Sequence, residues 1–376
     1  MNLFRMLFVF LAFIAINIYL FMRGWQALPG QAGIHTVYTL LFLVASTSVF
    51  VAIFAGNRLP VWAGHVLELI GGYWIILFIF ILAGALLADL LRVMNHYFGI
   101  YPGWVTANYE RSKLLYFLAV LVILAIISIS GYFRFSNPAV NKIDITVDHE
   151  SGLKSNLNIV AISDVHLGNL IRKNRLSRWV TLINSQDPDI ILIAGDLFDH
   201  SMRTVELQNM DAELSRLNAP YGVFAIPGNH DYYAGIDHAM NYMKRSGIRV
   251  LRDQAVTIDQ KLTIIGRDDK TNKNRKTLES LVRGLKSNLP ILVLDHQPSS
   301  LTESLNNNID LHISGHTHNG QIFPFNRIVS KIYDLGYGYR KNGNTHFYVS
   351  SGLGLWGAPI RLGTQSEIVR IALKVN

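Results

Sequence analysis

The sequence predicts a membrane protein in two parts, a four-helix transmembrane region over residues 1–136 and an α/β domain over residues 141–376. Two observations predict this division. Four long apolar runs fill the first part, whereas short β-branched runs that alternate with amphipathic stretches fill the second. In addition, half of all residues are hydrophobic and only 16% are charged. This composition differs from that of an ordinary soluble domain.

Each apolar run is close to the roughly 20 residues that a helix needs to cross the hydrocarbon core of a bilayer. The four predicted spans are Met6–Met22, Val37–Ala55, Leu67–Leu91 and Leu114–Tyr132. An even number of spans places both ends of the chain on one side of the membrane, and the positive charges on the two sides nearly balance. The short amino-terminal segment with Arg5 favours the cytoplasm. We therefore expect the carboxyl-terminal domain on the cytoplasmic side.

After Asn137-Pro138 the pattern changes to that of a layered α/β domain with a largely buried sheet. Two amphipathic stretches, Arg175–Ser185 and Thr204–Leu217, are predicted helices. The predicted strands are Asn158–Ile162, Ile190–Ala194, Gly222–Ile226, Ile291–Leu294, Leu311–Ser314 and His346–Ser350.

Five of these six strands lead directly into a cluster of Asp, Asn or His residues. The clusters are Asp164-Val165-His166, Gly195-Asp196-Leu197-Phe198-Asp199, Gly228-Asn229-His230-Asp231, Asp295-His296 and Gly315-His316-Thr317-His318. Because ligands of such sheets gather beyond the carboxyl ends of the strands, we expect these side chains to converge. Oxygen and imidazole ligands suit Mn, Fe or Zn. The chain contains no cysteine, which excludes a thiolate-ligated zinc site, a disulfide framework and a cysteine nucleophile.

The spacing within the clusters suggests how the ligands converge. In Asp164-x-His166 and His316-x-His318, alternate residues would point to one face of an extended segment. The glycines Gly195, Gly228 and Gly315 would permit tight turns next to the ions.

Taken together and in this order, the clusters resemble the signature of the calcineurin-like metallophosphoesterase superfamily, D-x-H, G-D-x-x-D, G-N-H-[D/E], H and G-H-x-H. The resemblance covers residues 141–376 and implies an αββα layered sandwich that binds two divalent metal ions. It implies that Asp164, His166, Asp196 and His318 hold one ion. The second ion would be held by Asp196 as a bridge, Asn229, His296 and His316.

The resemblance also implies a catalytic pair and a mechanism. His230 would donate a proton or position the phosphate, Asp231 would orient its ring, and Asp199 would support the turn. A hydroxide that bridges the two ions would attack the phosphorus in line, so no covalent phospho-enzyme is needed. His312, inside a predicted strand, is expected to be a hydrogen-bonded core residue instead.

Longer segments resemble a membrane-anchored bacterial branch of the superfamily that includes UDP-2,3-diacylglucosamine diphosphatases and related phosphodiesterases. These segments are residues 294–298, 315–324 and 350–361. The resemblance implies a protein of the bacterial inner membrane that hydrolyses a phosphodiester or diphosphate bond in a phosphorylated lipid or nucleotide-lipid. Asn319 departs from the glycine of many relatives.

Two further segments each have two candidate roles, and one arginine is a candidate ligand-binding residue. The stretch Phe323–Tyr339 is either a lip that contacts the bilayer or an acyl chain, or a packed surface loop. The basic run Arg267–Lys286 is expected to be a solvated helix face, with a patch for anionic headgroups as the alternative. Arg361 is a candidate for binding a phosphate.

Other functions remain as alternatives. A membrane sensor or scaffold with a ligand-binding, catalytically weak domain is the main one, but the complete set of ligand residues opposes it. A transporter is disfavoured because the helices show no polar pathway. A nucleic-acid partner is disfavoured because the domain has no long basic stripe or aromatic platform. The sequence does not indicate the oligomeric state.

Overall fold

The computed structural model describes residues 3–148, 155–285 and 289–376, and the chain divides into two compact units, residues 1–130 and 131–376. The last turn of helix α5 (Tyr109–Ser136) belongs to the second unit, because Phe135 is completely buried in the hydrophobic core of that unit. The observed boundary follows Ser130. It therefore lies one to two helical turns before residue 136, the predicted end of the transmembrane region.

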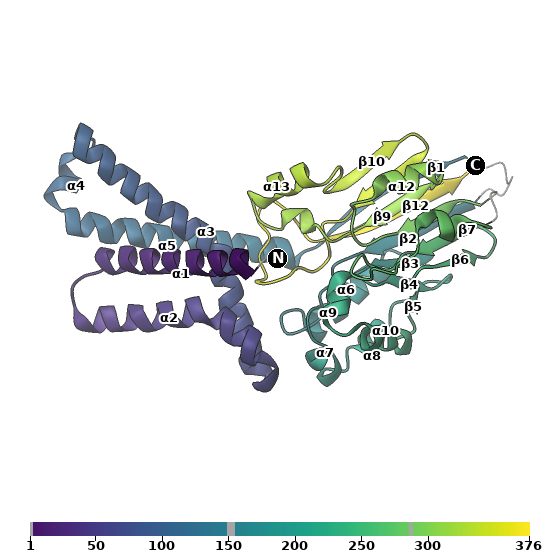
Figure 1. Ribbon diagram of the computed structural model, residues 1–376, viewed down its shortest axis with the longest axis horizontal. Helices are drawn as coiled ribbons and strands as arrows, with labels where there is room; N and C mark the ends of the chain where they lie inside the picture. Colours follow the sequence, from purple (N-terminus) through teal and green to yellow (C-terminus); the bar gives the residue numbers. More distant parts are fainter. Residues whose placement is uncertain (1–2, 149–154, 286–288) are drawn as a thin grey trace. The chain divides into compact units, whose positions relative to one another are not determined.

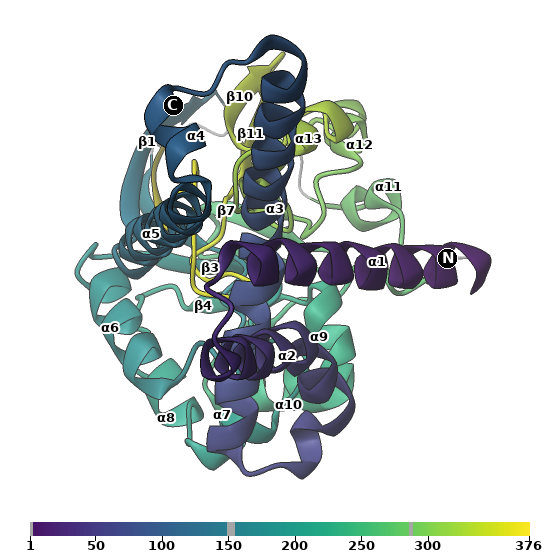
Figure 2. The same ribbon diagram turned by 90° about the vertical axis from the view of Figure 1, so that its left-hand side faces the viewer.

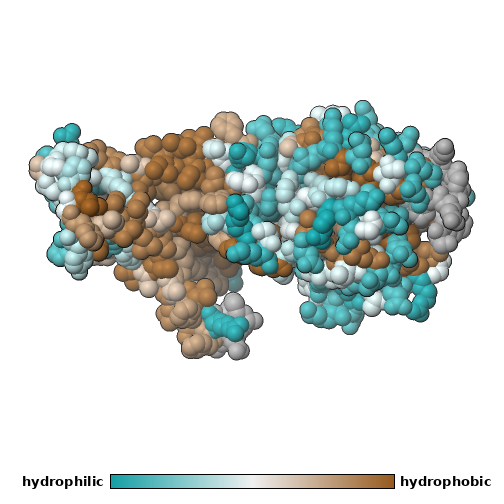
Figure 3. Space-filling view, turned by 90° about the horizontal axis from the view of Figure 1, so that it is seen from above, coloured by the Kyte–Doolittle hydropathy of each residue, from teal (hydrophilic) through white to brown (hydrophobic). Residues whose placement is uncertain are grey.

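The first unit contains the four predicted membrane helices, each long and apolar enough to span a bilayer. Its elements are α1 (Leu3–Ala27), α2 (Ala32–Ala55), a short 3-10 turn (Gly56–Arg58), α3 (Val61–Phe98), α4 (Gly103–Ala107) and most of α5. On the face seen in Figure 3, hydrophobic side chains cover most of this unit. Large apolar residues such as Leu41, Phe54 and Ile126 are exposed on it. Such a surface is suited to lipid and not to water.

The helices of the first unit pack closely in one place and separate in another. Gly71 of α3 lies against the backbone of Val49 in α2, where a Cβ atom would come within 2.6 Å of the Val49 nitrogen. By contrast, α3 and α5 diverge toward the end at which α4 joins them (Figure 1). In the view of Figure 2, α1 is inclined to α2 and α5.

The second unit is built on two six-stranded mixed sheets. The first has the order β1-β12-β2-β3-β4-β5 and the second has the order β10-β11-β9-β8-β7-β6. Strands of the first sheet are β1 (Ala139–Val147), β12 (Glu367–Val375), β2 (Ser155–Ile162), β3 (Ile190–Ala194), β4 (Val223–Ile226) and β5 (Arg249–Val250). Strands of the second sheet are β10 (Gly338–Asn342), β11 (Thr345–Val349), β9 (Leu311–Ser314), β8 (Ile291–Leu294), β7 (Leu262–Gly266) and β6 (Gln254–Ile258).

The two sheets pack face to face between helices, which confirms the predicted αββα sandwich. Alternation along β3 shows the layering, because Ile190 and Leu192 point into the core between the sheets, whereas Ile191 and Ile193 point into the core beneath the helices. Helices on the first sheet include α6 (Lys173–Asn184), α8 (Asp211–Leu214) and α10 (Ile236–Arg245). On the second sheet, α11 (Leu278–Val282) contributes to a smaller core. Burial on both faces explains why the strands read as continuous apolar runs.

The structure corrects the predicted secondary structure in two ways. The single helix expected over Thr204–Leu217 is two short helices, α7 (Arg203–Leu207) and α8, because Asn209 between them has a left-handed φ of 48°. The remaining helices are α9 (Asn229–Tyr233), α12 (Leu301–Asn306) and α13 (Phe325–Ile332). Six strands were not predicted, namely β1, β5, β6, β7, β10 and β12.

Candidate metal centre

The loops that carry the predicted ligands all leave the carboxyl ends of strands. Strands β2, β3 and β4 are parallel neighbours in the first sheet, and β8 and β9 are parallel neighbours in the second. The loops after these five strands hold the predicted clusters, beginning at Ser163, Gly195, Pro227, Asp295 and Gly315. The topology therefore brings five separate segments of sequence to one end of the sandwich.

The side chains form two adjacent groups of candidate ligands. Asp164, His166 and His318 place ligand atoms within 4.8 Å of one another, and so do Asp196, His296 and His316. The Asp196 carboxylate lies between the groups, because its Oδ2 atom is 3.1 Å from Nε2 of His296 and 3.8 Å from Nε2 of His166. This is the arrangement in which one carboxylate can serve two ions.

Several polar atoms of these groups are buried without a hydrogen-bond partner among the described residues. They include Oδ1 of Asn229 and Nδ1 of His318. An unpaired buried polar atom is costly unless something else satisfies it. Together with oxygen and imidazole donors and the absence of thiolates, these atoms fit divalent metal ions.

The local electrostatics set the protonation of the ligands. Burial lowers the pKa of His316 to about 4, and the neighbouring His296 acts in the same direction. Burial also lowers the pKa of His318 well below the usual value, and the charge of His166 adds to this effect. Burial alone would raise the pKa of Asp196, but the surrounding histidines outweigh it, so the net pKa is lowered. By contrast, burial alone would lower the pKa of His166 and of His296, but the neighbouring carboxylates outweigh it and raise both. Because a cation binds a neutral imidazole and an ionised carboxylate, a bound ion would have to displace the protons of these two histidines.

The backbone at the ligands differs from the extended geometry that the sequence suggested. Five of the predicted ligands have left-handed φ angles of 50° to 72°, namely Asp164, His166, Asp196, His316 and His318. The i, i+2 pairs therefore converge through sharply turned backbone, and the interpretation as extended segments was wrong. Non-glycine residues rarely adopt this conformation. Those that do adopt it concentrate at functional sites.

The three glycines also have different roles. Gly195 has φ 89° and permits a turn, as expected. Gly228 has an ordinary φ of −112°, but a Cβ atom there would lie 2.1 Å from Oδ1 of Asp196. At Gly315 a Cβ atom would lie 2.3 Å from Oδ2 of Asp164. These two positions need glycine because a ligand carboxylate passes directly over the backbone.

The structure exchanges the roles expected for two acidic residues near His230. Oδ1 of Asp199, not Asp231, lies 3.0 Å from Nδ1 of His230. The Asp231 carboxylate instead accepts hydrogen bonds from the backbone N–H groups of Asp196, Phe198 and Gly228, at 3.0, 3.0 and 2.8 Å. Asp231 thus joins two ligand loops, and Asp199 holds the histidine ring. The role of Asp231 in orienting the ring is corrected accordingly.

Two aromatic neighbours of His230 were not identified from the sequence as part of the site. The ring centroids of His200 and Tyr233 lie 4.8 and 5.3 Å from that of His230, and Nδ1 of His200 lies 2.7 Å from Oδ1 of Asp199. His200 directly follows the G-D-x-x-D segment and Tyr233 lies three residues after His230. Proximity to a motif was the only signal that could have indicated them.

Arg361 is not a phosphate-binding residue in this structure. Its side chain is completely buried and donates hydrogen bonds to the carbonyl oxygens of Ser351 and Gly352, at 2.6 and 3.1 Å. Burial lowers its pKa to about 10. The guanidinium supports the loop after β11, whose Gly354 N–H donates to the Asp164 carbonyl oxygen at 2.9 Å.

Two arginines of the basic run that begins at Arg267 have structural roles, namely Arg267 and Arg275. Arg267 is buried and forms ion pairs with Asp295 and Glu303 at 3.0 and 2.7 Å, and Arg275 pairs with Asp295 at 2.8 Å. These two arginines therefore belong neither to a solvated face nor to an open patch, whereas Lys273, Lys276 and Arg283 of the same run are exposed, as expected. Lys286 lies outside the described residues.

His312 confirms its expected core role. It is buried, and its two ring nitrogens lie 2.6 Å from Oγ of Ser304 and 3.0 Å from Oγ of Ser314. Burial lowers its pKa to about 4, so the ring is neutral near pH 7.

Comparison with known proteins identifies the family. Residues 157–320 match the family described as calcineurin-like phosphoesterase. An uncharacterized metallophosphoesterase of Helicobacter pylori strain J99 is 32% identical, with 70% of this chain and 72% of the relative covered. An uncharacterized metallophosphoesterase of Campylobacter jejuni is 29% identical, with 98% and 99% covered. A protein of Danio rerio named "transmembrane protein with metallophosphoesterase domain" is 26% identical, with 94% and 81% covered.

The chain therefore belongs to the calcineurin-like metallophosphoesterase family, and it is a metal-dependent phosphoesterase with membrane helices. The Campylobacter and Danio relatives match over nearly the whole chain, so the likeness extends to the helical unit.

Proposed function

We propose that the protein hydrolyses a phosphodiester or diphosphate bond of a lipid-linked or nucleotide-lipid substrate, using two divalent ions of Mn, Fe or Zn. The position of the Asp196 carboxylate between the two ligand groups carries the two-ion part of this proposal. Asp164, His166 and His318 would hold one ion with Asp196. Asn229, His296 and His316 would complete the other.

The bound ions would supply Lewis-acid polarisation of the phosphoryl oxygens and a water nucleophile of lowered pKa. The protein's own contribution is position and proton transfer. His230 is only partly buried, and its ring centroid lies 4.5 Å from that of His166. Since Asp199 holds Nδ1, the opposite nitrogen is left to donate a proton to the leaving oxygen.

The lipid part of the proposal is supported by a surface next to the site. Helix α13 follows His318 after a short turn, and none of its residues is buried. Ile328 and Ile332 on it are 47% and 68% exposed, and Arg327 and Lys331 lie among them. The hydroxyl of Thr317 donates to the Gly336 carbonyl oxygen at 2.6 Å and ties this segment to the ligand loop. Exposed apolar and basic residues on one short helix suit a lipid substrate or a bilayer surface.

The proposed cellular setting rests on the membrane helices and on charge. Four membrane helices make the protein an integral membrane protein. We propose that it lies in the bacterial inner membrane, and that its catalytic domain lies in the cytoplasm because Arg5 precedes the first span.

The test uses full-length protein in mild detergent, loaded with Mn, Zn or Fe in parallel. Two substrates are compared, a chromogenic phosphodiester and UDP-diacylglucosamine. Asp196→Asn and His230→Ala should abolish turnover of both, and metal analysis should show two ions per wild-type chain. His238→Ala is the matched control, because His238 is an exposed histidine paired with Glu206 and should have no effect.

Two outcomes would overturn parts of the proposal separately. Wild-type turnover no higher than that of Asp196→Asn, despite bound metal, would refute hydrolysis and favour the sensor alternative. Turnover of the chromogenic diester without turnover of the lipid would retain the phosphoesterase and refute this nucleotide-lipid as its substrate.

A further inference from the structure

A large cavity lies inside the helical unit, far along the chain from the metal centre. Its volume is about 680 Å³, and it is lined by residues of α1, α2, α3, α4 and α5 between Leu20 and Leu124. Cavities of roughly 300 to 1,000 Å³ are typical of small-molecule and cofactor sites.

The cavity exists because small residues of α3 face a helix that diverges from it. Gly84, Ala85 and Ala88 line the α3 side, and the opposite wall is formed by α5. The Tyr116 hydroxyl of α5 donates to the Gly84 carbonyl oxygen at 2.7 Å and bridges the gap. Small residues usually let membrane helices pack closely, but here they leave space.

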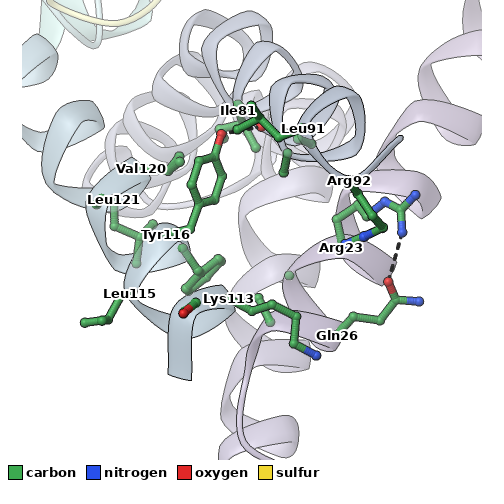
Figure 4. A pocket seen from close by; sticks show the side chains of 18 of the residues that line it. Arg23, Gln26, Ile81, Leu91, Arg92, Lys113, Leu115, Tyr116, Val120 and Leu121 are labelled. Carbon is green, nitrogen blue, oxygen red and sulfur yellow. Dashed lines mark hydrogen bonds between the residues drawn. The ribbon is translucent and has the colours of Figure 1, made fainter. Parts of the chain in front are cut away.

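The two ends of the cavity differ in polarity (Figure 4). Leu115, Val120 and Leu121 lie at one side, whereas Arg23, Gln26, Arg92 and Lys113 gather at the other. The side chain of Arg23 donates to Gln26 at 3.0 Å. Most of the lining is apolar, and Phe42, Trp74 and Ile81 extend it away from the cations.

The cations are only partly neutralised by acidic groups. Asp89 pairs with both Arg23 and Arg92, and it also accepts a hydrogen bond from the Tyr19 hydroxyl at 2.8 Å. Lys113 pairs with the exposed Glu110 at 2.7 Å. Three cationic side chains thus pair with two carboxylates, which leaves a net charge of one positive unit. In addition, Nε of Arg23 is buried without a hydrogen-bond partner in the described part of the chain.

The sequence positions place this polar end at a membrane surface. Arg23 lies near the end of α1, Arg92 near the end of α3 and Lys113 near the start of α5. Helices that cross alternately bring these three ends to the same side. The stretch of α3 from Arg92 back to Ile81 rises about 16 Å, which is about half of a hydrocarbon core of about 30 Å. The cavity therefore has the depth of one lipid leaflet below a cationic rim.

We propose that this cavity binds one anionic phospholipid. Its phosphate would lie among Arg23, Arg92 and Lys113, and one acyl chain would fill the apolar space between α3 and α5. Anionic headgroups gain about 1 kcal/mol per nearby cation, whereas a zwitterionic headgroup gains much less. This inference does not rest on the proposed phosphoesterase substrate.

The first test is lipid binding to delipidated full-length protein in detergent, measured by native mass spectrometry. Phosphatidylglycerol should bind as a single copy, about tenfold more tightly than phosphatidylcholine with the same acyl chains. Inorganic phosphate alone should neither bind nor compete at the same concentration. Equal retention of the two lipids would mean unspecific lipid contact, and competition by free phosphate would mean an ion site, and each result would overturn the proposal.

The second test compares two cations on α5. Lys113→Gln should weaken phosphatidylglycerol binding about fivefold, the equivalent of about 1 kcal/mol, and leave phosphatidylcholine unchanged. Arg111→Gln removes the same charge two residues away, from an exposed position outside the cavity lining, and should have no effect. Equal losses in the two variants would show general attraction and not a site.

The third test blocks the cavity after folding. Because the chain has no cysteine, Ala88→Cys creates a single thiol in the cavity wall. Alkylation by a bulky maleimide should remove phosphatidylglycerol binding, and a methylthio group should leave most of it. Leu87→Cys is the control, since Leu87 is exposed on the same helix and outside the lining. Unchanged binding to the alkylated Ala88→Cys protein would refute the proposed position of the acyl chain.

Discussion

Gly228→Ala is the sharpest test of the candidate metal centre, because it adds one methyl group and replaces none of the ligand residues. Gly228 has φ −112° and ψ −178°, a conformation that alanine adopts without strain. The added Cβ would lie 2.1 Å from Oδ1 and 2.5 Å from the backbone nitrogen of Asp196. The substitution therefore acts by displacing the Asp196 carboxylate.

The size of the displacement can be worked out from the contact. Ordinary contact with a Cβ begins at about 3.4 Å, so a distance of 2.1 Å must increase by about 1.3 Å. Metal–ligand distances tolerate only about 0.2 Å, and a 1 Å misplacement at a reacting centre can cost about a hundredfold in rate. We expect turnover to fall at least about a hundredfold and one ion to be lost, with an overpacking cost of about 1–3 kcal/mol in stability.

The assay combines phosphodiester turnover, metal content per chain and thermal unfolding of the full-length protein. Gly168→Ala is the matched control, because its Cβ would lie 3.3 Å from Cβ of Asp199 and require only a small adjustment. The control should retain activity within about threefold. If Gly228→Ala retains wild-type turnover with two ions bound, Asp196 does not occupy the position on which the reasoning depends.

Three further predictions follow from buried polar groups. The pKa of His312 is about 4 in the fold and 6.5 when unfolded, so the unfolded state binds more protons between these values. Stability should therefore be complete above pH 6.5 and fall by about 3 kcal/mol toward pH 4. The free energy of unfolding of His312→Gln, measured against pH, should lack this component. Parallel pH profiles of the wild type and the variant would contradict the prediction. Asp199→Asn should lower kcat about 10- to 100-fold with little change in stability, whereas Asp231→Asn should destabilise the fold by about 2–4 kcal/mol. The reverse pattern, measured by kinetics and unfolding, would restore the expected role of Asp231 at the ring of His230. Arg361→Gln should cost about 3 kcal/mol or more in stability, because it leaves buried carbonyl oxygens unpaired. A raised KM at unchanged stability would instead indicate phosphate binding.

Much of the fold was predictable because burial on both sides of a sheet produces continuous apolar runs. Ile190–Ala194, Ile291–Leu294 and Leu311–Ser314 were predicted with the limits that the structure shows. The long outer strand Ala139–Val147 was missed because it alternates between exposed and buried residues and directly follows a membrane helix. The break in Thr204–Leu217 was missed because a left-handed asparagine has no strong sequence signal.

The residues of the candidate site were predictable from their place at strand ends, but their contacts were not. His230 was expected to pair with its sequence neighbour Asp231, yet it pairs with Asp199 from the preceding loop. Chain proximity favoured the wrong carboxylate, because Asp231 at the third position of helix α9 turns back toward the Gly228 N–H instead. Arg361 was misassigned because its burial beneath the loop after β11 depends entirely on tertiary structure.

The ligand residues with left-handed φ angles are held in place by the folded domain itself. A non-glycine residue in this conformation costs of order 1–3 kcal/mol and persists only where the surrounding structure enforces it. Here the enforcement is visible, because the N–H of Asp164 donates to the Gly195 carbonyl oxygen at 3.0 Å and that of His166 donates to the Asp196 carbonyl oxygen at 3.1 Å. The first ligand loop is thus fixed to the second through the backbone, and the Gly315 N–H donates to the His296 carbonyl oxygen at 3.0 Å, which connects the fourth and fifth loops. Asp231 joins the third loop to the second. The free-energy cost of these left-handed conformations is part of the folding of the domain. Binding of ions therefore requires little further ordering of the ligand loops.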